Sequence, residues 1–244
     1  MIRDIHPAFR PPKTNLTLWR YMDLAKLLSL LESQTLYFSR TDQFDDPYEG
    51  RLSKGLVEML RRMDPQPPGQ PGMVDQFIES MEFHRRSMFI SCWCSKEHES
   101  AAMWKLYLQS PEGIAIRTDH QSLANAMQPS PLSIGTTLVQ YADYEEASMP
   151  FGNIFFPFVF KRASFSHEEE LRAIIWGLED VNRSLITEDS KHVSVPINPS
   201  QLIKAIHVSP WAPKWFGELV SSLARRYSLN CEVVNSSLYD RPTY

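Results

Sequence analysis

The chain has 244 residues, a formal charge of −4 at pH 7 and 43% hydrophobic residues. This length and composition are typical of a globular protein, and the slightly acidic balance argues against a general nucleic-acid binder. No apolar run reaches the ~18 residues of a membrane-spanning helix. The first seven residues lack the apolar core of a secretory signal, and the three cysteines cannot form a disulfide framework. We therefore expect a cytoplasmic protein without a membrane partner.

Residues 1–15 are rich in proline and polar groups, which predicts a loose N-terminal arm. Asp23 is expected to cap the first helix. A flexible surface loop is predicted at residues 64–73, which hold four prolines and two glycines. Up to residue 94, the hydrophobic spacing predicts strands at 18–21, 36–40 and 87–94, and helices at 24–32, 52–63 and 74–86.

The second half continues this alternation, although residues 149–160 fit neither pattern. The predicted helices are 99–109, 120–127 and 213–227, and the strands are 113–118, 136–141, 170–177, 192–197, 203–209 and 231–234. No glycine-rich phosphate loop and no internal repeat occur. The irregular crossovers favour an α+β fold, a single domain over residues 16–240 with helices packed on a mixed or mainly antiparallel sheet.

The acidic stretch at residues 44–50 is the first candidate site. One interpretation is a helix start, with Asp46 as the cap, Pro47 in the first turn and Glu49 completing a capping box. A capping box does not need Asp45 or the neighbouring aromatic residues. The second interpretation is therefore a cap that also walls a binding site.

Acids this close together repel one another unless a cation lies among them. Arg20 is the nearest plausible cation, because Lys161 and Arg172 lie on later predicted elements. We therefore expect a partly buried pair of Arg20 with Glu49, in which the arginine lowers the pKa of the acids.

A second charged stretch precedes the predicted strand at 170–177. Glu168, Glu170 and Arg172 share one face if that strand begins early, because side chains alternate along a strand. The stretch is either a solvated strand end or a pair of carboxylates that an internal arginine holds ionised. Lys161 and Arg162 add positive charge shortly before it.

Aromatic residues and cysteines complete the candidates. Trp104 and Tyr107 lie on the predicted helix at 99–109, either as core or as a flat wall for a ligand ring. Cys92 and Cys94 with His98 superficially resemble a metal site, but zinc normally needs four ligands, usually as two spaced pairs. We expect no metal site.

A series of short motifs resembles an uncharacterised, mainly bacterial family known only as a domain of unknown function. The resemblance spans roughly residues 16–240 and implies no established activity. The motifs, in order, are Trp19-Arg20-Tyr21, Phe44 to Glu49, Ile90-Ser-Cys-Trp93, Met103 to Tyr107, Gly113-Ile-Ala-Ile116, Val139-x-Tyr141, Lys161 and Glu168 to Arg172.

The order of Arg20, Ser91 and Glu168-x-Glu170 is also similar to ADP-ribosyltransferases. That resemblance implies an arginine that binds the phosphates or ribose of NAD and a carboxylate that stabilises an oxocarbenium-like state. It makes Glu170 and Glu168 the catalytic candidates.

Together these stretches predict one polar cleft. Two function classes stay open. The favoured one is a ligand-sensing or defence-associated module that binds a small molecule, a nucleotide or a protein partner. The alternative is a nucleotide-handling enzyme of ADP-ribosyltransferase type, and NAD is expected only in that class. The expected walls are Arg20, Asp45, Asp46, Glu49, Ser91, Trp104, Tyr107, Lys161, Glu168, Glu170 and Arg172.

Overall fold

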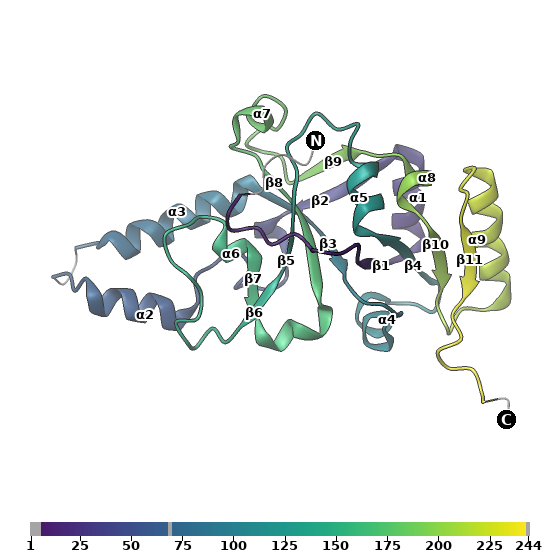
Figure 1. The fold of residues 1–244 in the computed structure, drawn as a ribbon, viewed down its shortest axis with the longest axis horizontal. Helices are drawn as coiled ribbons and strands as arrows, with labels where there is room; N and C mark the ends of the chain where they lie inside the picture. Colours follow the sequence, from purple (N-terminus) through teal and green to yellow (C-terminus); the bar gives the residue numbers. More distant parts are fainter. Residues whose placement is uncertain (1–5, 68–69, 243–244) are drawn as a thin grey trace. The chain divides into compact units, whose positions relative to one another are not determined.

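The computed structural model describes residues 6–67 and 70–242. They form an α+β fold with a mixed, mostly antiparallel sheet, which confirms the predicted class (Figure 1). The chain divides into two compact units, so the single domain predicted over residues 16–240 stays a prediction. Unit 1 consists of Met1–Pro11, Tyr37–Cys92 and Pro131–Val193, and unit 2 of Pro12–Leu36, Trp93–Ser130 and Ser194–Tyr244.

In unit 2, four strands lie in the order β11-β10-β4-β1, and Cys94, the last residue of β3 (Met88–Cys94), pairs with β1. Only β10 and β11 run parallel. The strands are β1 (Thr17–Asp23), β4 (Gly113–Asp119), β10 (Ala205–Val208) and β11 (Glu232–Asn235). The helices are α1 (Leu24–Ser33), α4 (Ala101–Tyr107), α5 (His120–Ala126), α8 (Pro199–Leu202) and α9 (Lys214–Arg226).

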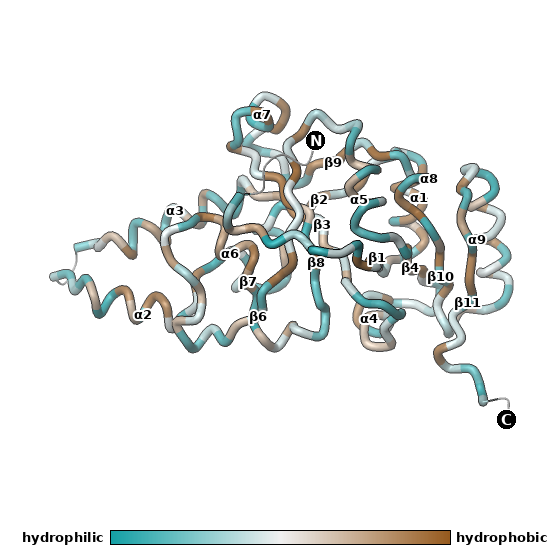
Figure 2. The backbone as a smooth tube through the Cα atoms, in the orientation of Figure 1, coloured by the Kyte–Doolittle hydropathy of each residue, from teal (hydrophilic) through white to brown (hydrophobic). Residues whose placement is uncertain are grey.

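Local signals explain where the helices of unit 2 begin and which face they bury. The Asp23 carboxylate accepts a hydrogen bond from the Lys26 N–H at 2.8 Å, which confirms the predicted cap of α1. Along α9, Phe216, Val220 and Ala224 are buried at helical spacing. Figure 2 shows hydrophobic and hydrophilic residues alternating along this helix.

In unit 1, the strand β8 lies between β3 and β5, and β2 pairs antiparallel with β3. A second small sheet pairs β6 and β7 in parallel. The strands that lie wholly or mostly in unit 1 are β2 (Thr35–Arg40), β3 (Met88–Cys94), β5 (Gly135–Leu138), β6 (Gln140–Ala142), β7 (Phe160–Arg162) and β8 (Glu170–Trp176), whereas β9 (His192–Pro196) begins in unit 1 and ends in unit 2. The helices are η1 (Thr41–Gln43), α2 (Lys54–Met63), α3 (Met73–Ser87), α6 (Phe156–Val159), η2 (Ala163–Glu168) and α7 (Asp180–Arg183).

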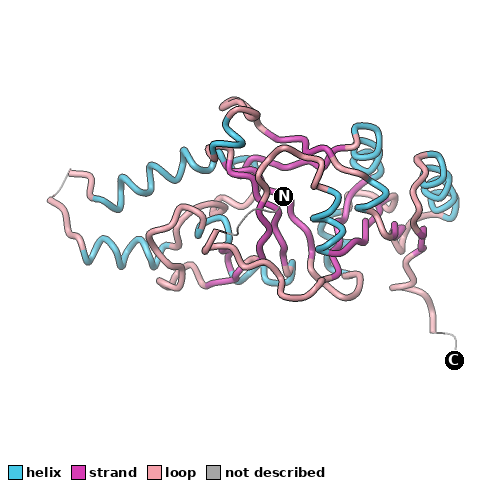
Figure 3. Tube along the Cα trace, turned by 45° about the horizontal axis from the view of Figure 1, so that its top comes forward, coloured by secondary structure: helices cyan, strands magenta, loops and turns pink. Residues whose placement is uncertain are grey.

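The helices α2 and α3 lie side by side and are linked by an ion pair between Arg61 and Asp75 (Figures 1 and 3). Residues 64–72 connect them, while Met73 already belongs to α3. The described residues of this connection are exposed except Gly72, which is buried and whose N–H donates to the Asp75 carboxylate. Residues 68–69 of the predicted loop lie outside the described residues. No helix in the described parts of the chain is both long and apolar enough to cross a membrane.

The prediction of a loose N-terminal arm is partly wrong, because residues 6–10 belong to unit 1 and pack within it. Ala8 is buried, and Phe9 lies against Gly135 and the ring of Phe155. The backbone of Arg10 bonds to β5 through the Leu138 N–H at 2.9 Å. Apolar contacts and a strand-like hydrogen bond hold a segment whose composition alone predicts no structure.

The acidic stretch also departs from the prediction, since no helix begins at Asp46. Its carboxylate accepts from the Tyr48 N–H at 3.0 Å and closes a turn instead. Gly50 then adopts a φ of +72°, which no regular helix accepts. The helix α2 begins four residues later, with Ser53 as its cap. The capping box predicted for Asp46 and Glu49 is therefore absent from this described stretch, and both carboxylates are used elsewhere.

Candidate functional site

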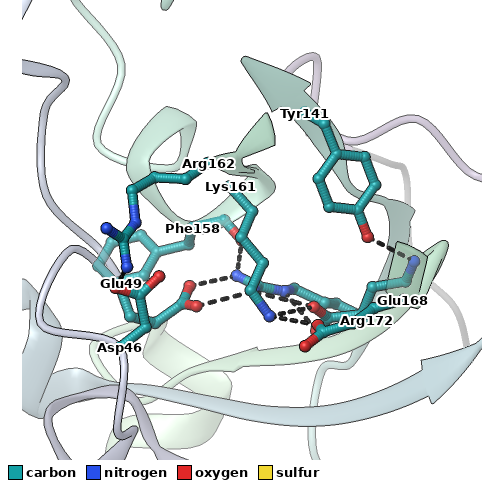
Figure 4. A network of polar contacts seen from close by, with 9 residues as sticks. Asp46, Glu49, Tyr141, Phe158, Lys161, Arg162, Glu168 and Arg172 are labelled. Atoms are coloured by element: carbon teal, nitrogen blue, oxygen red, sulfur yellow. Dashed lines mark hydrogen bonds and ion pairs between the residues drawn. The ribbon is translucent and has the colours of Figure 1, made fainter. Parts of the chain in front are cut away.

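A buried cluster of charges in unit 1 contains five of the predicted site residues (Figure 4). Arg172 and Glu170 lie on β8, Lys161 on β7 and Glu168 at the end of η2, while Glu49 comes from the turn that follows η1. Arg172 and Glu170 share a face of β8 because they are two residues apart, as the sequence predicts.

Arg172 is the centre of this cluster and is fully buried. Its Nη1 and Nη2 donate to the two carboxylate oxygens of Glu49, with 2.9 Å between Nη2 and Oε2. Its Nε donates to Oε1 of Glu170 at 2.8 Å, and Nη1 also reaches the Phe158 carbonyl at 2.7 Å. The planar guanidinium thus satisfies two carboxylates at once, which an ammonium group could not do in this geometry.

Lys161 contacts the carboxylates of both Glu168 and Glu170. Its Nζ donates to Oε2 of Glu170 at 3.1 Å and forms an ion pair with Glu168. The lysine and Glu168 are both half-buried, whereas Glu170 is buried. Glu168 is therefore the carboxylate of this pair that solvent reaches more readily.

Two neutral groups complete the surroundings of Glu170. The Tyr141 hydroxyl accepts the Glu170 N–H at 2.8 Å, and the Cys92 thiol donates to the Glu170 carboxylate. Burial raises the pKa of both Tyr141 and Cys92, so both stay protonated at neutral pH. Neither adds charge to the cluster.

Glu170 and Glu49 both bind Arg172, but their pKa values shift in opposite directions because Glu170 also contacts Lys161. Burial opposes the ionisation of Glu170, but Arg172 and Lys161 outweigh it and lower its pKa to about 2. Burial raises the pKa of Glu49, whose carboxylate has Arg172 as its one hydrogen-bonding cation among the described residues. Glu170 is thus the carboxylate that the fold holds ionised.

The predicted pairing of Arg20 with Glu49 requires two corrections. Arg172, from the later element, is the cation that contacts both oxygens of Glu49. The expected lowering of the pKa of Glu49 is also wrong, because burial outweighs the arginine there. In unit 2, the Arg20 guanidinium lies 5.5 Å from the ring of Trp93.

The aromatic candidates belong to unit 2, and Trp104 packs on the face of β1 opposite to Arg20. Trp104 is fully buried, meets the ring of Tyr21 edge-on at 4.9 Å and donates to Glu99. Since Tyr21 and Arg20 are neighbours on β1, their side chains point to opposite faces. Tyr107 is 47% exposed at the end of α4. Trp104 is therefore core, and one cleft wall made by both Trp104 and Arg20 is not supported.

Ser91, Asp45 and Asp46 lie outside the charge cluster around Arg172. Ser91 is buried on β3 next to Cys92, so alternation directs it away from the face on which Cys92 meets Glu170. Asp45 is exposed. Asp46 accepts from Nη2 of Arg162 at 2.8 Å and thus lies beside the cluster rather than within it.

Three residues of the site were not proposed from the sequence: Cys92, Tyr141 and Arg162. Tyr141 belongs to the motif Val139-x-Tyr141, but its role depends on the pairing of Tyr141 with Lys161 between β6 and β7. Within the described residues, no group of three or more histidine, cysteine or acidic side chains could hold a metal ion. Cys92 and Cys94 are free thiols.

No protein-family model and no curated protein matches this chain. Among solved structures, it is similar to Thermus sp. 2.9 DarT in complex with NAD+ and to the same protein in complex with carba-NAD+. Each is 11% identical, covers 93% of this chain and has a TM-score of 0.41, and the matches cover 98% and 97% of those chains. At this score the likeness carries no functional argument.

Proposed function

We propose that this chain acts on a nucleotide at a ribosyl bond, as an enzyme of ADP-ribosyltransferase type that uses NAD. The observation that carries the proposal is the charge of the cluster. Among the described residues, three carboxylates, Glu49, Glu168 and Glu170, contact two cations, Lys161 and Arg172. The carboxylates outnumber the cations, and half-buried Glu168 is the most exposed of the three, so this end of the cluster suits a substrate that is, or becomes, cationic.

The chemistry of NAD matches this requirement. When its glycosidic bond breaks, the bonding electron pair leaves with nicotinamide, which becomes neutral, and positive charge develops on the ribose. An acceptor then bonds to the ribose carbon and loses a proton. Ionised carboxylates stabilise such oxocarbenium-like states, and fixed charges in a partly buried site do so without reorganising.

The two glutamates have different roles in this proposal. Both oxygens of Glu170 already accept from Arg172 and Lys161, so Glu170 orients Lys161 and supplies a fixed negative charge. Glu168, bound to Lys161 and half-buried, is the group that faces substrate. We thus assign the catalytic contact to Glu168 and the positioning role to Glu170.

Nicotinamide release from NAD+ by the purified protein tests the proposal. Glu168→Gln should lower the rate by about 10²–10³, the usual effect of one electrostatic group at a transition state. Glu145→Gln is the matched control, since Glu145 also pairs with a lysine in unit 1 but is exposed. Equal rates for wild type and Glu168→Gln, both above the protein-free rate, would refute the assigned role.

A ligand-sensing module is the second candidate, and one observation favours it. The Glu170 side chain is only 4% exposed and fully engaged, which is typical of a structural charge centre rather than a reacting group. Calorimetric binding of NAD+ without nicotinamide release would support sensing over turnover. The defence-associated role and a protein partner stay predictions.

A further inference from the structure

Arg162, at the end of β7, is held on three sides by other residues of unit 1. Its guanidinium carbon lies 4.5 Å from the ring centre of Tyr48 and 5.1 Å from that of Phe165. Its Nη2 donates to Asp46 at 2.8 Å, and Asp46 is itself fixed by the Tyr48 N–H. Figure 4 shows Arg162 directed towards Asp46, apart from the Arg172 contacts.

The held guanidinium still has unused donors. Its side chain is 31% exposed. Of its five N–H donors, one has a hydrogen-bond partner among the described residues, and the buried Nε has none there. A guanidinium that is already immobilised loses little conformational freedom when it binds a ligand. Its remaining edge is therefore preorganised for an oxyanion, which arginine binds through two parallel hydrogen bonds.

The position of Arg162 connects it to the substrate-facing carboxylate. Lys161 precedes it in β7, and the Lys161 Nζ lies 4.8 Å from the same Phe165 ring. The Phe165 ring thus contacts both Arg162 and the lysine that binds Glu168. A ligand that carries both an anionic group and a cationic centre could therefore bind Arg162 with the first and Glu168 with the second.

We propose that Arg162 binds a phosphate group of the nucleotide and thereby determines that the ligand is a nucleotide rather than a nucleoside. This inference rests on the proposed function, because that function supplies the cationic centre at Glu168. Asp46 offsets most of the net charge of Arg162. Recognition then depends on the fork geometry of the guanidinium more than on its charge, so lysine should not replace it.

Calorimetric titration with ADP and with adenosine tests this role. Arg162→Lys should weaken ADP binding by about tenfold or more, since lysine keeps the charge but loses the fork. Adenosine binding should not change. Arg61→Lys is the matched control, because Arg61 makes the same Nη2 contact with an aspartate, Asp75, but is 57% exposed. It should leave both affinities unchanged.

Three results would overturn the inference: wild type that does not bind ADP, Arg162→Lys that binds ADP as wild type does, or an equal loss of ADP and adenosine affinity. The last result, with a lower melting temperature, would assign Arg162 a structural role only. Absent nicotinamide release combined with Arg162-dependent ADP binding would refute the proposed reaction and leave this subsite standing. The two proposals therefore fail separately.

Discussion

At the scale of single residues, Arg172 is the centre of the buried charge cluster in unit 1. A buried guanidinium and its carboxylates have lost their hydration, and each depends on the others for compensation. This explains why Glu49, Glu170 and the Phe158 carbonyl all converge on one side chain. Removing Arg172 takes from Glu49 the cation that contacts both of its oxygens and leaves Glu170 with Lys161.

We predict that Arg172→Met lowers the free energy of unfolding by about 3–5 kcal/mol, because Glu49 and Glu170 lose their shared cation. Glu49→Gln should cost less. In the double variant the losses should fall short of their sum by about 0.5–3 kcal/mol, as for residues in contact. Urea unfolding of the four proteins measures this cycle. Strictly additive losses would contradict the contact, and Arg61→Met, which breaks an exposed pair, should change little.

The pH dependence of stability should separate the two carboxylates. The folded pKa of Glu170 is about 2 against an ordinary 4.5, so its stabilisation is present above pH 4.5 and lost as the pH falls towards 2. The raised pKa of Glu49 has the opposite sign, since its ionisation costs stability as the pH rises above 4.5.

We therefore expect the melting temperature of Glu170→Gln to lie furthest below wild type near neutral pH and to approach it in acid. Relative to Glu49→Gln, wild type should instead lose stability as the pH rises above 4.5. Thermal melts of the three proteins across this range provide the measurement. A difference between Glu170→Gln and wild type that does not depend on pH would mean that Glu170 is not held ionised by the fold.

At the scale of elements, the turn after η1 determines where Glu49 lies. Gly50 has a φ of +72°, and a Cβ there would lie 2.5 Å from Phe158 and 2.9 Å from Arg85. A side chain would therefore meet both backbone strain and overlap with the core. The turn requires glycine at this position for two independent reasons.

Gly50→Ala should destabilise the protein by about 1–3 kcal/mol from overlap, in addition to the backbone strain. Gly152→Ala is the control, because Gly152 also has a positive φ of +93° but has nothing within 4 Å of an added Cβ. Chemical denaturation of both variants should show the larger loss for Gly50→Ala. Equal losses would indicate that strain alone acts at Gly50.

At the scale of the whole molecule, the two units are each assembled from three separate segments of the chain. Consequently, neither unit corresponds to a contiguous stretch that composition could mark as a domain. The cluster around Arg172 lies within unit 1, whereas Arg20, Trp104 and Tyr107 belong to unit 2. A site that combines them stays a prediction, as do the cytoplasmic location and the absence of general nucleic-acid binding.

The sequence by itself determined the α+β class, most helices and strands, and the shared face of Glu170 and Arg172. These depend on hydrophobic spacing, caps and strand alternation, which act between near neighbours. Only the tertiary structure decided which cation meets which carboxylate. Glu49 is 123 positions from Arg172, and Asp46 is 116 from Arg162. No local pattern encodes such pairs, because the register of strands and the path of a glycine turn bring them together.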